Sequence, residues 1–324
     1  MTKILLTGIS GQVGGELQQT LLSLGEIIAV NRQQLDLTQP QQIAEAIATI
    51  KPDIIVNAAA YTSVDKAETE TDLAMAINAT APQVIAEAAA KIQATVVHIS
   101  TDYVFNGQNH LPYTETDATD PLGVYGKSKL LGEEAVRNKC DRHIIIRTAW
   151  VYGCRGHGNF VKTMLRLGAE RTELKVVADQ IGSPTWSYDL SWAIAQILAQ
   201  LPSNLRTTQA RGCDSNSLRV PECPALEFNS RDASLPLGTY HFTNSGVASW
   251  YDLAIAIFEE AKLLGFELKI GRVIPIATID YPTSAQRPAY SVLDKQKITQ
   301  LLGEHPPHWR ESLKAMLAQW QSLK

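Results

Sequence analysis

The sequence has few cysteines, no long apolar run and no excess of positive charge. Its 324 residues include four cysteines, which stand apart without a Cys-x-x-Cys pair, so the pattern indicates no zinc site. No apolar run reaches the roughly 18 residues that a membrane helix needs, and the apolar run within residues 1–7 is too short for a secretory signal. The net charge of −4 provides no broad basic surface for nucleic acid. We therefore expect a reduced, cytoplasmic protein that spans no membrane and binds no nucleic acid.

The hydrophobic pattern indicates a parallel α/β sheet. With 45% hydrophobic and 19% charged residues, the chain is able to bury a large core. Short apolar runs alternate with longer amphipathic stretches, which is typical of βα units around a parallel sheet covered on both faces. The expected strands are residues 3–7, 27–30, 54–57, 95–99 and 144–147, and the expected helices include 12–24, 71–91 and 122–138. This predicts an α/β fold with a doubly wound parallel sheet (Rossmann) and a smaller, discontinuous substrate-binding lobe.

The rhythm of βα units weakens after residue 150, which suggests the domain boundaries. Residues 1–153 are expected to form the dinucleotide-binding Rossmann domain, rejoined by about 186–201 and 238–243. Residues 154–185 and 244–324 are expected to form the substrate-binding lobe. Residues 203–236 are rich in polar residues and proline without helical or strand periodicity, so they are predicted to be an inserted surface loop.

A glycine-rich turn follows the first predicted strand. Gly8, Gly11 and Gly14 form a Gly-x-x-Gly-x-x-Gly motif that leads into a helix containing Gln12 and Val13. The first glycine permits a sharp turn, the second lets a pyrophosphate approach the backbone, and the third allows close packing of helix on strand. A tight turn that binds nothing is the alternative, but the position at the start of a βα series favours a dinucleotide site.

The end of the second strand bears on the choice of cofactor. NAD-selective sites place an acidic residue about 20 positions beyond the glycines, on the ribose 2′-hydroxyl. Here the strand ends in Asn31 and Arg32, and an arginine can pair with a 2′-phosphate through two hydrogen bonds. Asp36 and Leu37 are expected to flank the adenine. The sequence thus predicts NADPH, with use of NADH left open and a solvated Arg32 as the alternative.

The third predicted strand ends in small residues. Ala58, Ala59, Ala60 and Thr62 follow it directly, and small residues beyond a strand's carboxyl end let a flat cofactor lie against the backbone. The alternative is the start of an alanine-rich helix. Position after the third strand favours the cofactor.

Three side chains form a candidate catalytic group. Tyr125 and Lys129 lie four residues apart and hence on one face of the predicted helix, while Ser100 and Thr101 follow the fourth strand. Reduction of a ketone needs a proton for the oxygen, and a nearby ammonium lowers the pKa of a phenol. We expect Tyr125 to be the general acid, Lys129 to tune it and anchor the nicotinamide ribose, and Thr101 to donate to the carbonyl oxygen. Ser100 is expected at the cofactor. The alternative is an ordinary surface helix.

These motifs together resemble the extended short-chain dehydrogenases, and further stretches narrow the resemblance to the dTDP-4-dehydrorhamnose reductase family. The first set comprises the glycine turn, Ser-Thr-Asp-Tyr-Val-Phe at 100–105 and Tyr-x-x-x-Lys at 125–129. The narrower stretches are residues 56–62, 64–68, 147–152, 159–165, 179–185, 250–252 and 287–288. The resemblance covers nearly the whole chain except 203–236.

The resemblance implies a substrate and a pocket. The substrate would be dTDP-4-dehydro-L-rhamnose, reduced by NADPH at its 4-keto group to dTDP-L-rhamnose. Tyr103, Trp150, Asn159 and Arg287 fall on positions that line the sugar-nucleotide pocket, together with Thr101 and Tyr125. For three of them an ordinary role is the alternative: core packing for the tryptophan, a helix cap for the asparagine and a loop position for the arginine.

The resemblance leaves the metal and the oligomeric state open. Some family members dimerise through magnesium held by glutamates, and Glu16 lies near one such position. The rest of that cluster has no match in this sequence. No metal site is therefore predicted, Mg²⁺ stays uncertain, and both a monomer and a homodimer are compatible with the sequence.

Two other functions compete. One is an epimerase or dehydratase acting on another nucleotide sugar with recycled NAD, which the missing acidic residue beyond the second strand argues against. The other is a non-catalytic regulatory subunit resembling the methionine adenosyltransferase β subunit. The intact set of Thr101, Tyr125 and Lys129 favours an enzyme.

Overall fold

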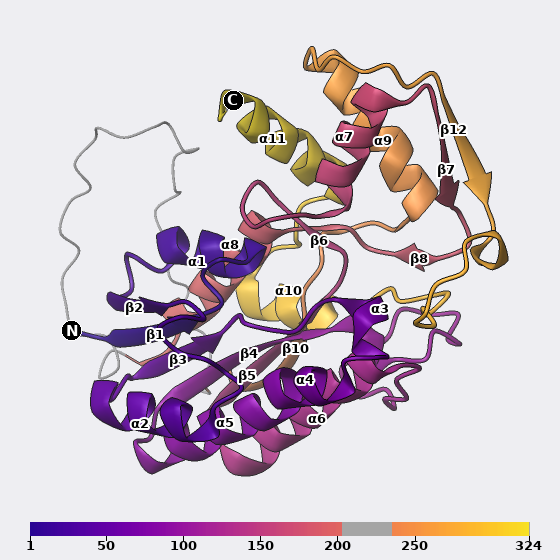
Figure 1. The fold of residues 1–324 in the computed structure, drawn as a ribbon. Coiled ribbons are helices and arrows are strands. Elements are labelled where there is room, and N and C mark those ends of the chain that lie inside the picture. Colours follow the sequence, from indigo (N-terminus) through magenta and orange to yellow (C-terminus); the bar gives the residue numbers. More distant parts are fainter. Residues whose placement is uncertain (203–234, 324) are drawn as a thin grey trace.

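A six-stranded parallel sheet forms the larger part of the molecule (Figure 1). The computed structural model describes residues 1–202 and 235–323. The strands are β1 (Lys3–Thr7), β2 (Glu26–Val30), β3 (Ile54–Asn57), β4 (Thr95–Thr101), β5 (His143–Thr148) and β10 (Gly238–His241). They run in the order β2-β1-β3-β4-β5-β10, and every neighbouring pair is parallel. The predicted α/β fold with a parallel sheet is confirmed. The predicted inserted loop, 203–236, lies almost entirely outside the described residues.

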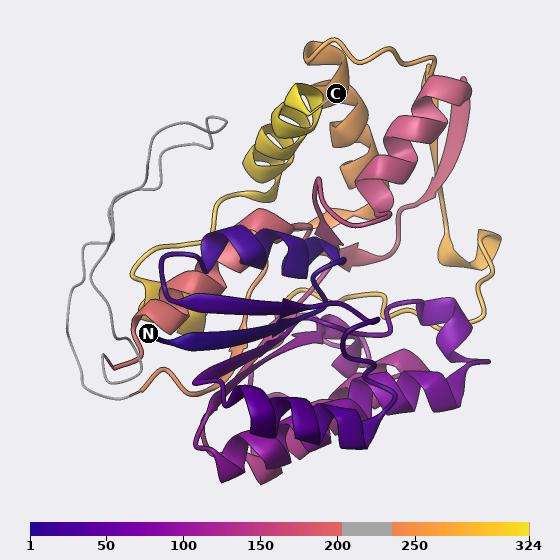
Figure 2. The same cartoon turned by 60° about the vertical axis from the view of Figure 1, so that its left-hand side comes forward.

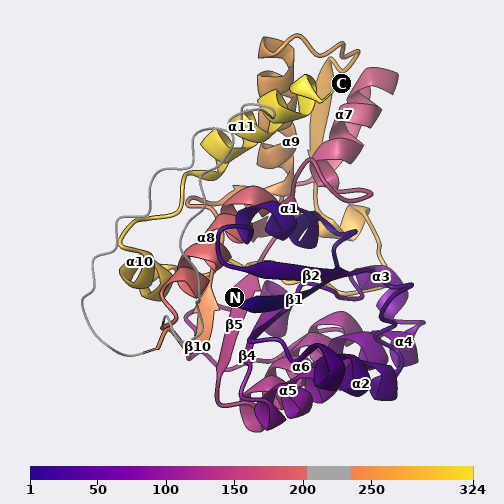
Figure 3. The same ribbon diagram turned by 90° about the vertical axis from the view of Figure 1, so that its left-hand side faces the viewer.

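Helices cover both faces of this sheet, as Figures 2 and 3 show from two further directions. On one face lie α1 (Gln12–Thr20), α8 (Ser187–Ala199) and α10 (Gln296–Leu302), and on the other α2 (Pro40–Ile50), α5 (Ala81–Lys91) and α6 (Val124–Lys139). Consecutive strand residues serve opposite faces: Leu6 packs on the side of α1 and α8, and Leu5 on the side of α2 and α5. Because helices cover both faces of the sheet, side chains on both faces are buried, and the strand sequences are therefore continuous apolar runs.

The helix expected at 71–91 is continuous but irregular. It begins as α4 (Thr71–Met75), passes through a π-helical turn (Ala76–Thr80) and continues as α5. A short helix, α3 (Val64–Ala67), precedes it, and a 3₁₀ turn (Asp102–Val104) follows β4.

A second lobe packs beside the carboxyl ends of the strands (Figure 1). Its elements are β6 (Val151–Tyr152), α7 (Phe160–Glu170), β7 (Glu173–Val177), β8 (Ile181–Gly182), β9 (Thr185–Trp186), β11 (Ala248–Ser249), α9 (Trp250–Leu263), β12 (Arg272–Ile276), a 3₁₀ turn (Thr278–Asp280) and α11 (Trp309–Ser322). They share a core of their own that includes Tyr152, Leu253 and Trp309. Within the expected lobe segment 244–324, α10 instead packs on α8 and β10, because Ile298 joins the core of the sheet. Among the described residues, no helix combines the length and apolarity needed to cross a bilayer.

A buried ion pair ties α6 to the sheet. Glu133 on α6 and Arg147 on β5 are both fully enclosed, with Nε of the arginine 2.9 Å from Oε1 and Nη2 2.7 Å from Oε2 of the glutamate. The partly exposed Arg137 adds a contact of 3.0 Å to Oε2. This helix also carries Tyr125 and Lys129, so the ion pair helps to set their position.

We predict that Glu133→Gln lowers the free energy of unfolding by about 3 kcal/mol or more, because it leaves the Arg147 guanidinium buried without its counter-charge. Urea denaturation of the variant and parent measures the loss. The double variant Glu133→Leu/Arg147→Met, which removes both charges, should recover most of it. A single variant within about 0.5 kcal/mol of the parent, the range of an ordinary surface change, would contradict this role.

Candidate active site

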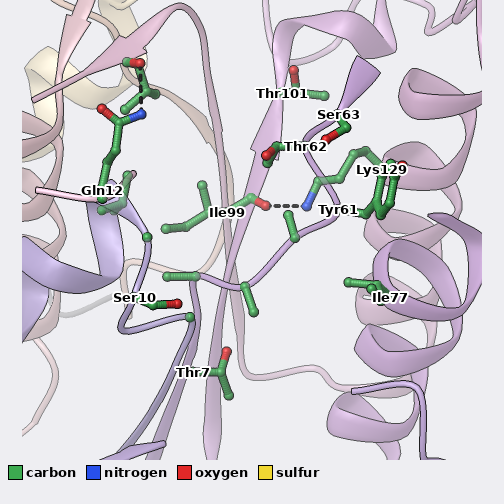
Figure 4. A pocket seen from close by; sticks show the side chains of 18 of the residues that line it. Thr7, Ser10, Gln12, Tyr61, Thr62, Ser63, Ile77, Ile99, Thr101 and Lys129 are labelled. Atoms are coloured by element: carbon green, nitrogen blue, oxygen red, sulfur yellow. Dashed lines mark hydrogen bonds between the residues drawn. The ribbon is translucent and has the colours of Figure 1, made fainter. Parts of the chain in front are cut away.

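A cavity of about 750 Å³ opens at the carboxyl ends of the strands, between the sheet and the second lobe. Figure 4 shows Gln12 on one side of it and Lys129 on the opposite side. Most of the predicted site residues line this cavity: Gly8, Gly11, Gln12, Val13, Asn31, Arg32, Asp36, Leu37, Ala58, Ala59, Ala60, Thr62, Ser100, Thr101, Tyr103, Tyr125, Lys129 and Trp150. Three do not line it: Gly14, Asn159 and Arg287.

The glycine turn has the close geometry that the motif predicts. Gly8 has a φ of +74°, and a Cβ there would lie 2.5 Å from the backbone of Ala58 and Ala59. Gly11 precedes α1 as its N-cap, and its N–H donates to the Gly8 carbonyl at 2.9 Å. A Cβ on Gly14 would lie 2.1 Å from that carbonyl oxygen, so Gly14 acts beneath the turn rather than in the cavity. The N-terminus of α1 thus faces the cavity and suits a pyrophosphate.

The loop after β2 forms one end of the cavity. Arg32 is exposed there, and Asn31 Oδ1 accepts from the N–H groups of Gln33 and Gln34 at 2.9 and 3.1 Å. Asp36 accepts from the N–H and hydroxyl of Thr38, and these bonds, with a contribution from the Arg32 charge, lower its pKa. Asn31 and Asp36 therefore shape the loop, while Arg32 offers its charge to the cavity.

Thr101, Tyr125 and Lys129 converge on the cavity from β4 and α6. The Thr101 hydroxyl donates to Asp102 Oδ1 at 3.0 Å, and the Tyr103 and Tyr125 rings meet edge to face at 5.4 Å. Enclosure by the protein raises the pKa of Tyr125 to about 12, although the Thr101 hydroxyl opposes this. The phenol is therefore protonated at neutral pH, as a general acid must be.

Lys129 is buried, and its ammonium is held away from bulk solvent. Its Nζ donates to the Ile99 carbonyl at 2.6 Å, the bond drawn in Figure 4. Burial lowers the pKa of Lys129 to about 8, partly opposed by Glu133. The expectation that Lys129 lowers the pKa of Tyr125 is not met in this structure, because burial of the phenol outweighs the other effects and Lys129 is not among them.

Two stacked tryptophans form a wall of the cavity. The Trp150 and Trp250 rings lie 3.5 Å apart and nearly parallel, at 4°. Trp150 has a φ of +49°, a strained value for a bulky residue. Its ring packs against Gly182, where a Cβ added to the glycine would lie 2.6 Å from the tryptophan ring. Trp250 Nε1 donates to Gln180 Oε1 at 3.2 Å. The family resemblance implied a pocket position for Trp150 but no role for Trp250, although residues 250–252 belong to a stretch that carries the resemblance.

Asn159 has the capping role that the sequence left open. Its Oδ1 accepts from the Lys162 N–H at 2.9 Å at the start of α7. Its Nδ2 donates to Gln12 Oε1 at 2.7 Å and to the Gly153 carbonyl at 2.9 Å. It therefore fastens the second lobe to the start of α1.

Arg287 is engaged by a carboxylate rather than open to the cavity. Its Nη2 lies 2.7 Å from Asp65 Oδ2, and its Nη1 lies 3.1 Å from Oδ1. These contacts raise the pKa of Arg287 despite partial burial and lower that of Asp65.

Two further parts of the cavity lining were not among the residues predicted from the sequence. Gly156, His157 and Gly158 line it, and a Cβ on Gly156 would lie 2.9 Å from Gln12 Cγ; the glycine-rich stretch 153–158 was the available signal. Asp102 also lines the cavity, with Oδ1 3.0 Å from the Thr101 hydroxyl that donates to it. Burial raises the pKa of Asp102 to about 6, partly opposed by hydrogen bonds from Ser291 and Thr101.

Glu16 makes an ion pair instead of joining a metal cluster. Its carboxylate is buried, with Oε2 3.3 Å from Arg155 Nε, and burial raises its pKa. In the described ranges 1–202 and 235–323, no three acidic, histidine or cysteine side chains gather as metal ligands would.

The glycine turn at β1, facing a Tyr-x-x-x-Lys helix across one cavity, defines the class as an extended short-chain dehydrogenase fold with a dinucleotide site. The model of the family described as RmlD substrate binding domain matches residues 1–210 and 224–322. The chain belongs to this family, and the resemblance inferred from the motifs is confirmed.

Three relatives illustrate the similarity. The dTDP-4-dehydrorhamnose reductase of Escherichia coli K12 is 43% identical over 318 residues, or 97% of this chain and 96% of that protein. A dTDP-4-dehydrorhamnose reductase structure from Clostridium acetobutylicum has a TM-score of 0.82 at 36% identity, covering 99% of this chain and 100% of that one. The enzyme from Bacillus anthracis, solved in complex with NADP, has a TM-score of 0.82 at 35% identity, covering 98% and 100%.

We predict that Asp102→Asn gains stability relative to the parent as the pH rises. A carboxyl whose folded pKa is raised, here from 3.8 to about 6, contributes stability below pH 3.8 that is lost as the pH climbs through 6. The neutral amide lacks this loss, so the difference in unfolding free energy should move in favour of the variant by about 2.4 kcal/mol between pH 4 and pH 7.5. Urea denaturation at both pH values measures it. A stability difference between variant and parent that does not change with pH would show that burial does not raise the pKa of the Asp102 carboxyl.

Proposed function

We propose that the chain is an NADPH-dependent reductase that converts dTDP-4-dehydro-L-rhamnose to dTDP-L-rhamnose by reducing its 4-keto group. The observation that carries this is the arrangement of one cavity: the glycine turn and Arg32 at one end, and Thr101, Tyr125 and Lys129 at the other. The names of relatives at about 40% identity support the substrate, and the NADP bound to the Bacillus anthracis enzyme supports the cofactor.

The donors that line the cavity fit a dinucleotide. Gly8 and Gly11 leave the α1 N-terminus bare where side chains would block a pyrophosphate, and Arg32 suits a 2′-phosphate. When bound, the reduced nicotinamide supplies the hydride. Tyr125 gives its phenolic proton to the ketone oxygen, and Thr101 donates a hydrogen bond to that oxygen. The Lys129 ammonium binds the nicotinamide ribose.

The substrate side of the proposal rests on the walls of the cavity. Tyr103 and Trp150 offer flat apolar surfaces to the sugar, with Trp250 behind the second of them. Arg287 is proposed to bind the diphosphate, which requires its guanidinium to reach the ligand from its pair with Asp65, because it does not line the cavity. Asn159 is proposed to act on the substrate only through the loop that it holds. The pairing of Arg287 with Asp65 supports a fixed orientation of its guanidinium.

The competing functions are not favoured. Relatives named as reductases cover nearly all of this chain, and the loop after β2 offers an arginine instead of the carboxylate of an NAD site. We expect the enzyme in the cytoplasm, which agrees with the free thiols of Cys140 and Cys154 among the described residues. Use of NADH, a role for Mg²⁺ and the choice between monomer and homodimer stay outside the proposal.

We predict that Arg32→Ala weakens NADPH binding about 10- to 100-fold, the value of a charge-assisted hydrogen bond to the 2′-phosphate. NADH lacks that phosphate, so its dissociation constant should change little. Fluorescence titration with both cofactors measures the effect, and Gln33→Ala, a neighbouring exposed position, is the control. Equal losses for the two cofactors would show that Arg32 does not read the phosphate.

We predict that Tyr125→Phe slows reduction of the dTDP-4-keto sugar about 10²- to 10⁴-fold, since it removes the proton donor but keeps the ring. Its NADPH dissociation constant should barely change, whereas Lys129→Met should lose both turnover and cofactor affinity. Single-turnover absorbance of the reduced nicotinamide, alongside binding titrations, separates the two effects. A Tyr125→Phe enzyme near the parent rate would mean that another group supplies the proton. A parent without activity on this sugar would overturn the proposed substrate.

A further inference from the structure

A row of polar side chains crosses the otherwise apolar sheet directly beneath the cavity. Thr7 on β1 pairs in register with Asn57 on β3, and Asn57 pairs in register with His98 on β4. All three side chains are buried, none more than 3% exposed. They lie on the face of the sheet that α5 and α6 cover, as their neighbours Leu5, Ile55 and Val96 do. A polar row in this place requires partners, because each unpaired polar group would cost free energy.

Hydrogen bonds join this row to the candidate catalytic lysine. The side-chain amide of Asn57 lies 2.8 Å from Thr7 Oγ1 and 3.2 Å from His98 Nδ1. On the other side of the ring, His98 Nε2 lies 3.4 Å from Lys129 Nζ, a longer contact than the 2.6 Å bond from Nζ to the Ile99 carbonyl. The row therefore ends at the amino group of a residue that lines the cavity.

The charge on Lys129 determines the direction of the bonds in the row. In the structure the Thr7 hydroxyl donates to Asn57 Oδ1 and Asn57 Nδ2 faces His98 Nδ1, which leaves the ring hydrogen on Nε2 and suits an uncharged amine. An ammonium offers only donors, so it needs Nε2 as an acceptor and the hydrogen on Nδ1. A half-turn of the Asn57 amide, which exchanges its oxygen and nitrogen, then lets Oδ1 accept from the ring Nδ1–H and Nδ2 donate to Thr7 Oγ1.

We propose that His98 is a positioning residue for the reduction: its Nε2 accepts from the Lys129 ammonium and, with the Ile99 carbonyl, holds that ammonium at the cavity. Asn57 and Thr7 keep the ring in the required tautomer and orientation. The role of His98 rests on the proposed function of Lys129, but the hydrogen-bond row itself does not.

The charged surroundings agree with a neutral imidazole in this role. Burial, with the positive charges of Lys129 and Arg137 on α6, holds the pKa of His98 well below its ordinary value, so the ring keeps a lone pair. Glu133, also on α6, raises the pKa of Lys129 against the effect of burial. Tyr125 and Asp102 face the same part of the cavity. None of these groups changes in the variants below.

A matched pair of substitutions separates positioning from packing. The amide of Gln reaches the place of a histidine Nε2, whereas the shorter Asn reaches only the place of Nδ1. The alkaline limb of the kcat/KM pH profile is expected to report deprotonation of the Lys129 ammonium. His98→Gln should keep this limb at the parent pH. His98→Asn should move that limb about one unit lower, because the ammonium loses one charge-assisted hydrogen bond, and should weaken NADPH binding about tenfold. KM for the sugar should stay within a few-fold in both.

Two outcomes of this comparison would overturn the proposal. One is a limb that does not move in His98→Asn, and the other is an equal shift in both variants, which would indicate disrupted packing. If neither variant folds, the proposal is tested by measuring the tautomer of His98 in the parent protein. In protein labelled with ¹⁵N-histidine, His98 should carry its hydrogen on Nδ1 at pH 6, where Lys129 is charged. Hydrogen on Nε2 at pH 6 would contradict the proposal.

The tautomer and the pH dependence of NADPH binding are measured without the sugar. A parent inactive on the dTDP-4-keto sugar but with hydrogen on Nδ1 would refute the proposed substrate and leave the row in place. An active parent with hydrogen on Nε2 would refute the role of His98 alone.

Discussion

The in-register parallel pairing of β1, β3 and β4 is the constraint on which the site depends. It brings the carboxyl ends of the three strands to one edge, so the glycine turn, the alanines after Asn57 and the candidate catalytic residue Thr101 open onto one cavity. The same register aligns Thr7, Asn57 and His98 beneath it. A slip of one residue would move each of these side chains to the opposite face of the sheet, because strand side chains alternate. The site and its polar support therefore form together.

Burial, more than pairing, sets the electrostatics of this site. It raises the pKa of Tyr125 to about 12 and of Asp102 to about 6, and it lowers that of Lys129 to about 8. All three shifts favour the neutral form, as transfer of a charge from water to protein must. Neutral Tyr125 is the form that gives a proton. The charged form of Lys129 is stabilised by the hydrogen bond to the Ile99 carbonyl, by the charge of Glu133 and by the acceptor that we assign to His98.

The cavity also depends on contacts between the sheet and the second lobe. Asn159 bonds Gln12 at the start of α1, and Gly156 packs against the same glutamine. Trp150, just after β5, stacks on Trp250 at the start of α9. These contacts join segments from distant parts of the chain, so a change in the lobe should alter the cofactor end as well as the substrate end.

The sequence by itself determined the parallel sheet, the glycine turn and the pair Tyr125 and Lys129, because each is a local pattern: alternating apolar runs, glycines at a fixed spacing, or two residues on one helical turn. Only the tertiary structure decided that Asn159 caps a helix and that Trp250 stacks in the cavity. It also decided that burial raises the pKa of the Tyr125 phenol and that His98 contacts Lys129. His98 was visible as a polar residue in an apolar strand. Its partners, Asn57 and Lys129, come from another strand and a helix. Which residues become neighbours across a sheet follows from pairing that no local pattern contains.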